Sequence, residues 1–234
     1  MIKSNMKRIR IYATIVSVVF SLHHYTANAA EPVFQLSEIS ENEFSEAFSQ
    51  RSKYQVHVDT VTSPQICKII CDKIIERLGS MDESDAMMYN PEDFKSDACT
   101  IVKFPFGWLA AIIHAAFENR EYWFFNEADY RFAAETGTLP EINGMHHCVS
   151  KEGYMATWQD RGYDSKADIS VYRLQDSGIQ LITRYPDVEI SSWEQVCWGD
   201  GNTFYIRGVY HNDDEESQAD EKSIPKCLKF TLSR

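Results

Sequence analysis

A β-hairpin is the strongest short-range pattern in this sequence, and it occupies Ile169-Ser170-Val171-Tyr172-Arg173-Leu174-Gln175-Asp176-Ser177-Gly178-Ile179-Gln180-Leu181-Ile182-Thr183. β-Branched and aromatic residues are frequent in both arms, and the central Asp-Ser-Gly is typical of a tight turn. The pattern therefore predicts two antiparallel strands, at 169–174 and 179–183.

Further strand patterns lie on both sides of this hairpin. Alternating apolar and polar residues predict a strand at 153–159, and a second hairpin joins 194–198 to 203–210 through a Gly-Asp-Gly-Asn turn. A last strand is expected at 227–232. We therefore expect a β part of about residues 141–234, built from antiparallel hairpins.

Helix signals are concentrated earlier in the chain. Ser63-Pro64 begins a predicted helix that ends at Gly79, because serine is a good N-cap and proline fits the first helical turn. Ser40 and Glu43 form a capping box for a helix within 37–51. A buried helix is also predicted over 104–117, which contains no charged residue, with a membrane-inserting helix as the alternative. A short helix is predicted over 127–135.

The helical part is thus expected to cover about residues 37–140. With the β part it forms one compact α+β domain over 30–234, in which a helical N-terminal half packs on a C-terminal antiparallel sheet. Disulfides are expected to staple the two halves together.

Residues 1–29 resemble a cleaved secretory signal peptide. Four basic residues precede an apolar run at 11–22, and Ala27-Asn28-Ala29 follows it with small residues. The run is shorter than the ~20 residues that a membrane-spanning helix needs. We therefore expect a periplasmic or secreted protein with no stable membrane anchor after cleavage; an uncleaved anchor is the alternative.

The charge of the chain excludes one class of partner. The full sequence has 23 basic and 35 acidic residues, and the first 29 residues contain four of the basic ones and none of the acidic ones. The expected mature protein therefore has a net charge of −16, starting from −12 for the full chain. Such a polyanion repels nucleic acid and anionic lipid surfaces and attracts a cationic protein.

The six cysteines predict disulfides, because an even number in an exported chain is typical of a disulfide framework. They are Cys67, Cys71, Cys99, Cys148, Cys197 and Cys227. We expect Cys197 to bond Cys227. We also expect Cys99 to bond one of the cysteines at 67 and 71, and Cys148 to bond the other.

The leading functional prediction is an exported acidic protein that binds and neutralises another protein, as an inhibitor or a periplasmic immunity-type factor does. The sequence has no recognisable nucleophile, phosphate-binding, dinucleotide-binding or zinc motif, so no cofactor or metal is expected. An acidic cluster would attract the basic partner, and an aromatic residue would anchor it. The candidate partner-binding residues are Asp213, Asp214, Glu215, Glu216, Trp193 and Tyr205.

The alternative function is a small secreted hydrolase that acts on polysaccharide or cell-wall material. Glu121, Glu127 and Asp129 lie in a segment rich in aromatic residues, and glycoside hydrolysis needs two carboxylates beside a sugar-binding surface. A further cluster, His146-His147-Cys148, could place an imidazole and a thiol on one face of a strand. A disulfide at Cys148 is favoured over a catalytic role there.

Overall fold

The computed structural model describes residues 33–81, 89–95, 99–114, 120–133, 142, 146–160, 166–190, 192–200, 202–210 and 224–233. Met1–Pro32 and Val33–Arg234 form two units, and the second carries every described element. Within the described residues, neither α-helix is long and apolar enough to cross a bilayer.

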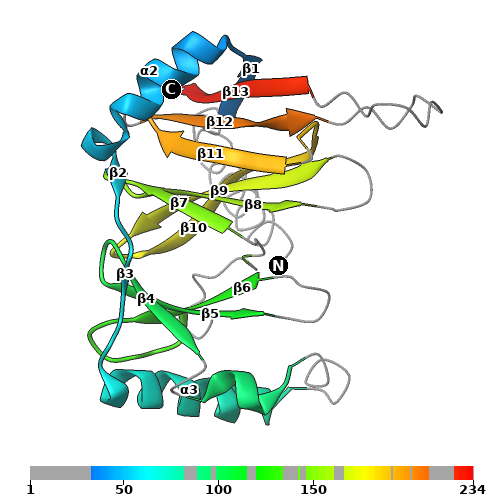
Figure 1. Ribbon diagram of the computed structural model, residues 1–234. Coiled ribbons are helices and arrows are strands. Elements are labelled where there is room, and N and C mark those ends of the chain that lie inside the picture. The colour runs from blue at the N-terminus through cyan, green and yellow to red at the C-terminus, as the bar shows by residue number, and fades with distance from the viewer. Residues whose placement is uncertain are drawn as a thin grey trace, which may run out of the picture. The chain divides into compact units, whose positions relative to one another are not determined.

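Three antiparallel sheets and two α-helices form the described part of the second unit (Figure 1). The helices are α2 (Glu41–Ser49) and α3 (Pro64–Leu78), and two 3-10 turns, η1 (Arg51–Lys53) and η2 (Pro91–Phe94), accompany them.

The three sheets are named here in the order in which they pack. Sheet A contains β1 (Val33–Glu38), β13 (Ile224–Ser233), β12 (Thr203–Tyr210) and β11 (Ser192–Trp198), in that order across the sheet. Sheet B contains β10 (Gly178–Val188), β9 (Ala167–Gln175), β8 (Tyr154–Asp160), β7 (His146–Ser150) and β2 (Gln55–Val56). Sheet C contains β3 (Asp59–Thr60), β4 (Thr100–Phe104), β5 (Trp108–His114) and β6 (Arg120–Asn126).

The central strands of sheet B, β8 and β9, are covered on both faces, whereas much of the edge strand β10 is exposed. On one face, Trp158, Ile169 and Val171 pack against Phe204 and Phe230 of sheet A. On the other face, residues such as Met155, Tyr172 and Leu174 pack against sheet C. The remaining face of sheet A carries α2, and that of sheet C carries α3, so each helix covers the outer face of one sheet.

The N-terminal segment contributes one strand to each sheet. β1 pairs with β13 in sheet A, β2 pairs with β7 in sheet B, and β3 pairs with β4 in sheet C. Figure 1 shows this segment passing beside all three sheets in turn. The predicted division into a helical half and a β half is therefore wrong, because strands from before residue 61 complete all three sheets.

The segment 104–117 is the largest local error of the sequence prediction. Its described part, 104–114, is a hairpin that joins β4 to β5 through a turn in which Phe106 and Gly107 both have positive φ. Almost all of β5 is buried, because sheet B covers one face and α3 the other. A strand that is buried on both faces loses its alternating pattern and resembles a buried helix.

The predicted helix at 127–135 is also absent from its described part. Asn126 accepts a hydrogen bond at 2.8 Å from the backbone N–H of Ala128, as a cap would, but a turn follows it. Phe132 then forms a bridge to Phe125.

Other local predictions are confirmed. α3 begins after Ser63, whose hydroxyl accepts a hydrogen bond from the N–H of Ile66, and it ends before Gly79. Both predicted hairpins are present as β9–β10 and β11–β12. The helix at 37–51 is shorter than expected, because residues 33–38 form β1.

The predicted disulfides are wrong, since all six cysteines are free thiols. Cys197 and Cys227 lie in β11 and β13, with β12 between them. Two strand spacings amount to about 9.5 Å, well beyond the ~4.4–6.8 Å between the Cα atoms of bonded cysteines. Cys148 lies between sheets A and B, whereas Cys67 and Cys71 belong to the buried side of α3, which packs on the far face of sheet C.

Candidate functional site

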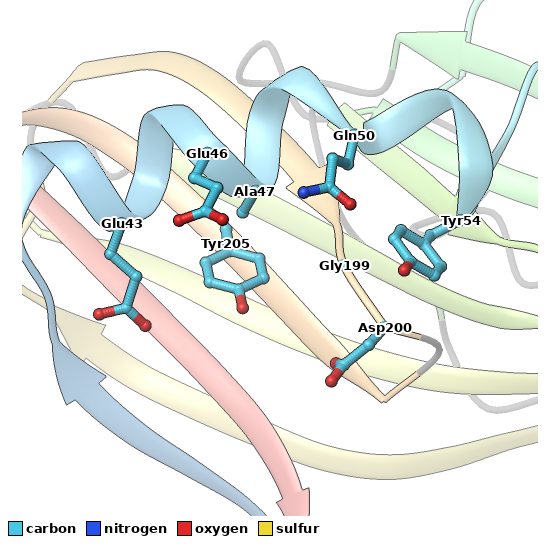
Figure 2. A pocket seen from close by; sticks show the side chains of 8 residues that line it. All are labelled: Glu43, Glu46, Ala47, Gln50, Tyr54, Gly199, Asp200 and Tyr205. Atoms are coloured by element: carbon cyan, nitrogen blue, oxygen red, sulfur yellow. The ribbon is translucent and has the colours of Figure 1, made fainter.

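The candidate site is a cleft between α2 and the turn that joins β11 to β12, here called the α2 cleft. It has a volume of about 200 Å³. Its lining residues are Glu43, Glu46, Ala47, Gln50, Tyr54, Gly199, Asp200 and Tyr205. Figure 2 shows the side chains of Glu43 and Glu46 on α2, those of Gln50 and Tyr54 on the chain that continues from this helix, and those of Asp200 and Tyr205 facing them from sheet A.

The helical repeat explains why these side chains share the cleft. Residues 43 and 46 are three apart and therefore lie on one side of α2, and Gln50 is the C-cap residue that follows the helix. Phe44 lies on another side, where it is buried against Cys197, Tyr205 and Cys227 of sheet A. α2 thus presents a polar edge to the cleft while its apolar face fixes it to the sheet.

Two cations of sheet A hold the first turns of α2 in place. The guanidinium of Arg207 lies 2.8 Å from a carboxylate oxygen of Glu41. The ammonium of Lys229 donates a hydrogen bond at 3.0 Å to Glu43, which raises the pKa of Lys229. Glu41 and Glu43 are therefore occupied in attaching the helix to the sheet.

Glu46 and Asp200 are different. Among the described residues, neither of their side chains has a recorded hydrogen bond or ion pair, and both residues are exposed. Two carboxylates without a recorded hydrogen bond or ion pair in the described part of the chain therefore line the α2 cleft, although Lys229 acts on Asp200 through longer-range charge. They come from two elements that are about 150 residues apart in the sequence.

Tyr205 provides an aromatic surface inside this acidic cleft. Burial raises the pKa of Tyr205, Lys229 opposes the shift, and the carboxylates of Asp200 and Glu43 add to it. The ammonium of Lys229 lies 5.7 Å from the centre of the ring. This cation already demonstrates, inside the protein, that an amine can rest over the Tyr205 ring and bond a cleft carboxylate at the same time.

Gly199 keeps the Tyr205 ring in place by having no side chain. A Cβ atom built on Gly199 would lie 2.5 Å from Cε2 of Tyr205, closer than real Cβ contacts come. The glycine therefore allows the turn to pack directly against the ring.

The arrangement suits the binding of a cationic side chain. A lysine or arginine carries an apolar stem, which can lie on the tyrosine rings, and a charged head, which can reach the carboxylates. Among the described residues no three His, Cys, Asp or Glu side chains could hold a metal ion together.

The predicted partner-binding residues have different outcomes. Tyr205 lines the α2 cleft, but Asp213, Asp214, Glu215 and Glu216 lie outside the described residues. Trp193 belongs to β11 and pairs with Gly208, and its side chain also lies outside what the structure describes. The sequence analysis missed Glu46 and Asp200, although the helical spacing of Glu43 and Glu46 was visible.

The three carboxylates proposed for a hydrolase are each held by a different neighbour. Glu121 accepts hydrogen bonds from the hydroxyl of Tyr89 at 2.5 Å and the indole of Trp123 at 3.2 Å. Glu127 is paired with Lys103, and Asp129 lies 2.6 Å from Nε of Arg131. Each carboxylate therefore has its own structural partner.

The histidine cluster is distributed over the two faces of β7. His146 stacks on Trp158, and Cys148 lies on the same face, between sheets A and B. His147 points to the other face, where its Nδ1 lies 3.1 Å from the hydroxyl of Tyr122. Burial, followed by the charges of Arg120 and His146, lowers the pKa of His147 to about 4.

Comparison with known proteins adds no relative. No protein-family model, no curated protein and no solved structure matches this chain.

Proposed function

We propose that this protein binds and neutralises a basic partner protein, and that the α2 cleft receives a lysine or arginine side chain of that partner. The observation that carries the proposal is a pair of exposed carboxylates beside the Tyr205 ring, Glu46 and Asp200, for which the described residues provide no hydrogen bond or ion pair. Neutralisation would occur by occlusion, because a bound chain of this size covers the surface around the inserted residue.

The charge of the whole chain supports the same partner class. A net charge of −12, or −16 after removal of the proposed signal peptide, accelerates encounter with a basic protein over a range set by the ionic strength. The long-range field would bring the partner close, and the cleft would fix its orientation. Export to the periplasm or the medium is part of this proposal and rests on the N-terminal sequence.

A capture experiment with matched variants tests the proposal. The protein is immobilised and exposed to envelope and culture extracts of its own source at about 100 mM salt. Three forms are compared: the natural protein, the cleft variant Glu46→Gln/Asp200→Asn, and the control variant Glu152→Gln/Asp176→Asn. The control removes the same charge from two exposed turn residues outside the cleft.

The expected result is a basic protein that the natural protein and the control retain in stoichiometric amount and the cleft variant releases. That protein would then be assayed for loss of its activity in the complex. Equal retention by all three forms would show that the α2 cleft does not bind the partner. Failure of the natural protein to retain any basic protein would contradict the binding function itself.

A further inference from the structure

A second cleft lies between α3 and sheet C, and its chemistry differs from that of the α2 cleft. This α3 cleft has a volume of about 330 Å³, which falls within the ~300–1,000 Å³ of small-molecule sites. Its lining residues are Lys73, Ile74, Glu76, Arg77, Ser80, Trp123, Phe125 and Phe132. Figure 1 shows α3 lying along the sheet that contains β4, β5 and β6.

The floor of the α3 cleft is aromatic and well fixed. Phe132 packs on Trp123 and on Phe125, with ring centres 5.6 and 5.2 Å apart. The indole N–H of Trp123 donates to the carboxylate of Glu121, which also accepts from Tyr89. The floor is therefore a preformed apolar surface, and Phe132 is only partly buried.

The rim of the α3 cleft carries two cations at helical spacing. Lys73 and Arg77 are four residues apart on α3 and line the cleft from one side of the helix. Among the described residues, neither Lys73 nor Arg77 has a recorded ion pair. The charge of Lys73 does contribute to the lowered pKa of Asp129, after the larger effects of Arg131. Within the part of the chain that the structure describes, Glu76 is the one carboxylate that lines the cleft, so this lining has a net positive charge in a strongly acidic chain.

An aromatic floor below paired cations defines a ligand class. Aromatic side chains bind a flat ring or a short acyl chain, and Arg77 can hold a carboxylate or sulfonate with two parallel hydrogen bonds. A purely polar anion would leave the floor unfilled, and a neutral apolar molecule would leave the cations unused.

We propose that the α3 cleft is a binding site for a small amphipathic anion, in which an acidic head lies against Lys73 and Arg77 and an apolar body lies on Trp123 and Phe132. This site does not depend on the α2 cleft or on the proposed partner protein. Its ligand would be a small molecule with a single ring system or a short acyl chain, since the cleft volume allows no more.

Displacement of a fluorescent probe tests the site. The probe is 8-anilinonaphthalene-1-sulfonate, an aromatic sulfonate whose emission rises in apolar surroundings, and the full protein is titrated with it. Octanoate and the octyltrimethylammonium cation are then added as competitors of equal chain length and opposite charge. Lys73→Gln/Arg77→Gln and Phe132→Ala are the cleft variants, and Lys68→Gln, an exposed lysine of the same helix outside the cleft, is the control.

The expected result is saturation at one equivalent of probe, displacement by octanoate, and no displacement by the cation. The double variant and Phe132→Ala should each weaken probe binding by about tenfold or more, while Lys68→Gln should leave it unchanged. Circular dichroism verifies that each variant is folded. Binding that does not saturate, equal displacement by both competitors, or unchanged affinity in the folded cleft variants would overturn the proposal.

Discussion

The α2 and α3 clefts are built by the same device, a helix on the outer face of a sheet, and yet they have opposite chemistry. α2 has nine residues and one buried side chain, Phe44, and ion pairs assist its attachment to sheet A. α3 has 15 residues, five of them buried, and rests on an aromatic sheet face. The α2 cleft is lined mainly by acidic and other polar side chains, whereas the α3 cleft has cations at its rim and an aromatic floor.

The difference between the two attachments determines which charged side chains of each helix remain available to a ligand. At α2, the ion pairs use Glu41 and Glu43 and leave the next carboxylate along the cleft edge, Glu46, uncompensated. At α3, the attachment within the described residues is mainly apolar and uses no ion pair to sheet C, so the cations Lys73 and Arg77 remain available at the rim. The charge of each cleft therefore comes from the charged side chains that do not take part in attaching its helix.

The largest expected effect is a loss of stability when a buried side chain of α3 is shortened, because apolar packing attaches this helix to sheet C. Ile74→Ala should lower the free energy of unfolding by about 2–5 kcal/mol, because Ile74 is fully buried and the substitution leaves a cavity. The matched control is Ile75→Ala on the same helix, whose side chain is 44% exposed and should cost less than about 0.5 kcal/mol. Urea denaturation measures both; equal losses would show that α3 does not pack on sheet C as described.

Acid should weaken the sheet that carries the α3 cleft. His147 contacts Tyr122 on the inner face of sheet C, and its pKa is lowered from 6.5 to about 4, mainly by burial. The unfolded chain therefore binds the proton more readily, so stability is complete above about pH 6.5 and falls as the pH approaches 4. The full loss from this group is about 3 kcal/mol.

Denaturation curves between pH 7 and 4 measure this loss as the difference between the natural protein and His147→Asn. The control is His57→Asn, since the His57 side chain is 92% exposed. An identical pH dependence in the natural protein and His147→Asn would contradict the burial of an uncharged imidazole between sheets B and C.

The α2 cleft should depend on one glycine. Gly199→Ala places a Cβ atom 2.5 Å from the Tyr205 ring, so the ring or the turn must move. We expect a loss of about 1–3 kcal/mol in stability and loss of the partner from the α2 cleft, with unchanged probe binding at the α3 cleft. Gly79→Ala is the control, because its Cβ would meet only ordinary contacts at 3.5 Å. If the folded Gly199→Ala variant still retained the partner, the position of the Tyr205 ring would not be required for binding.

The smallest expected effect is the response to salt. Binding at the α2 cleft relies on charge at an exposed rim, so raising the salt from about 50 to 500 mM should weaken it severalfold. Probe binding at the α3 cleft should change less, because the aromatic floor supplies much of the affinity. Parallel titrations at both concentrations provide the measurement, and equal salt responses would contradict the difference between the two clefts.

The sequence was informative wherever a local signal decided the structure. Ser63 and Gly79 defined α3, and a short polar turn defined each of the two C-terminal hairpins. Sheet C was missed because β5 is covered by sheet B and by α3, and two-sided burial removes the alternation that identifies a strand.

The cysteines and the site were harder to predict for a different reason. The even cysteine count predicted disulfides, but the spacing of the thiols depends on which layer each strand enters. In the same way, Glu46 and Asp200 line one cleft only because α2 packs beside the β11–β12 turn. The helical spacing of residues in α2 could predict an acidic helix edge, but it could not predict the aromatic ring that lies beside this edge.

The most direct test of the α2 cleft is an NMR titration with a blocked Gly-Gly-Arg-Gly-Gly peptide. The same peptide with citrulline in place of arginine has nearly the same shape and no charge. We predict that the arginine peptide shifts the backbone amide signals of Gly199, Asp200 and Tyr205, that the citrulline peptide does not, and that Glu46→Gln/Asp200→Asn abolishes the response. Equal shifts with both peptides, or shifts that are absent from these three residues, would contradict a cation-binding cleft.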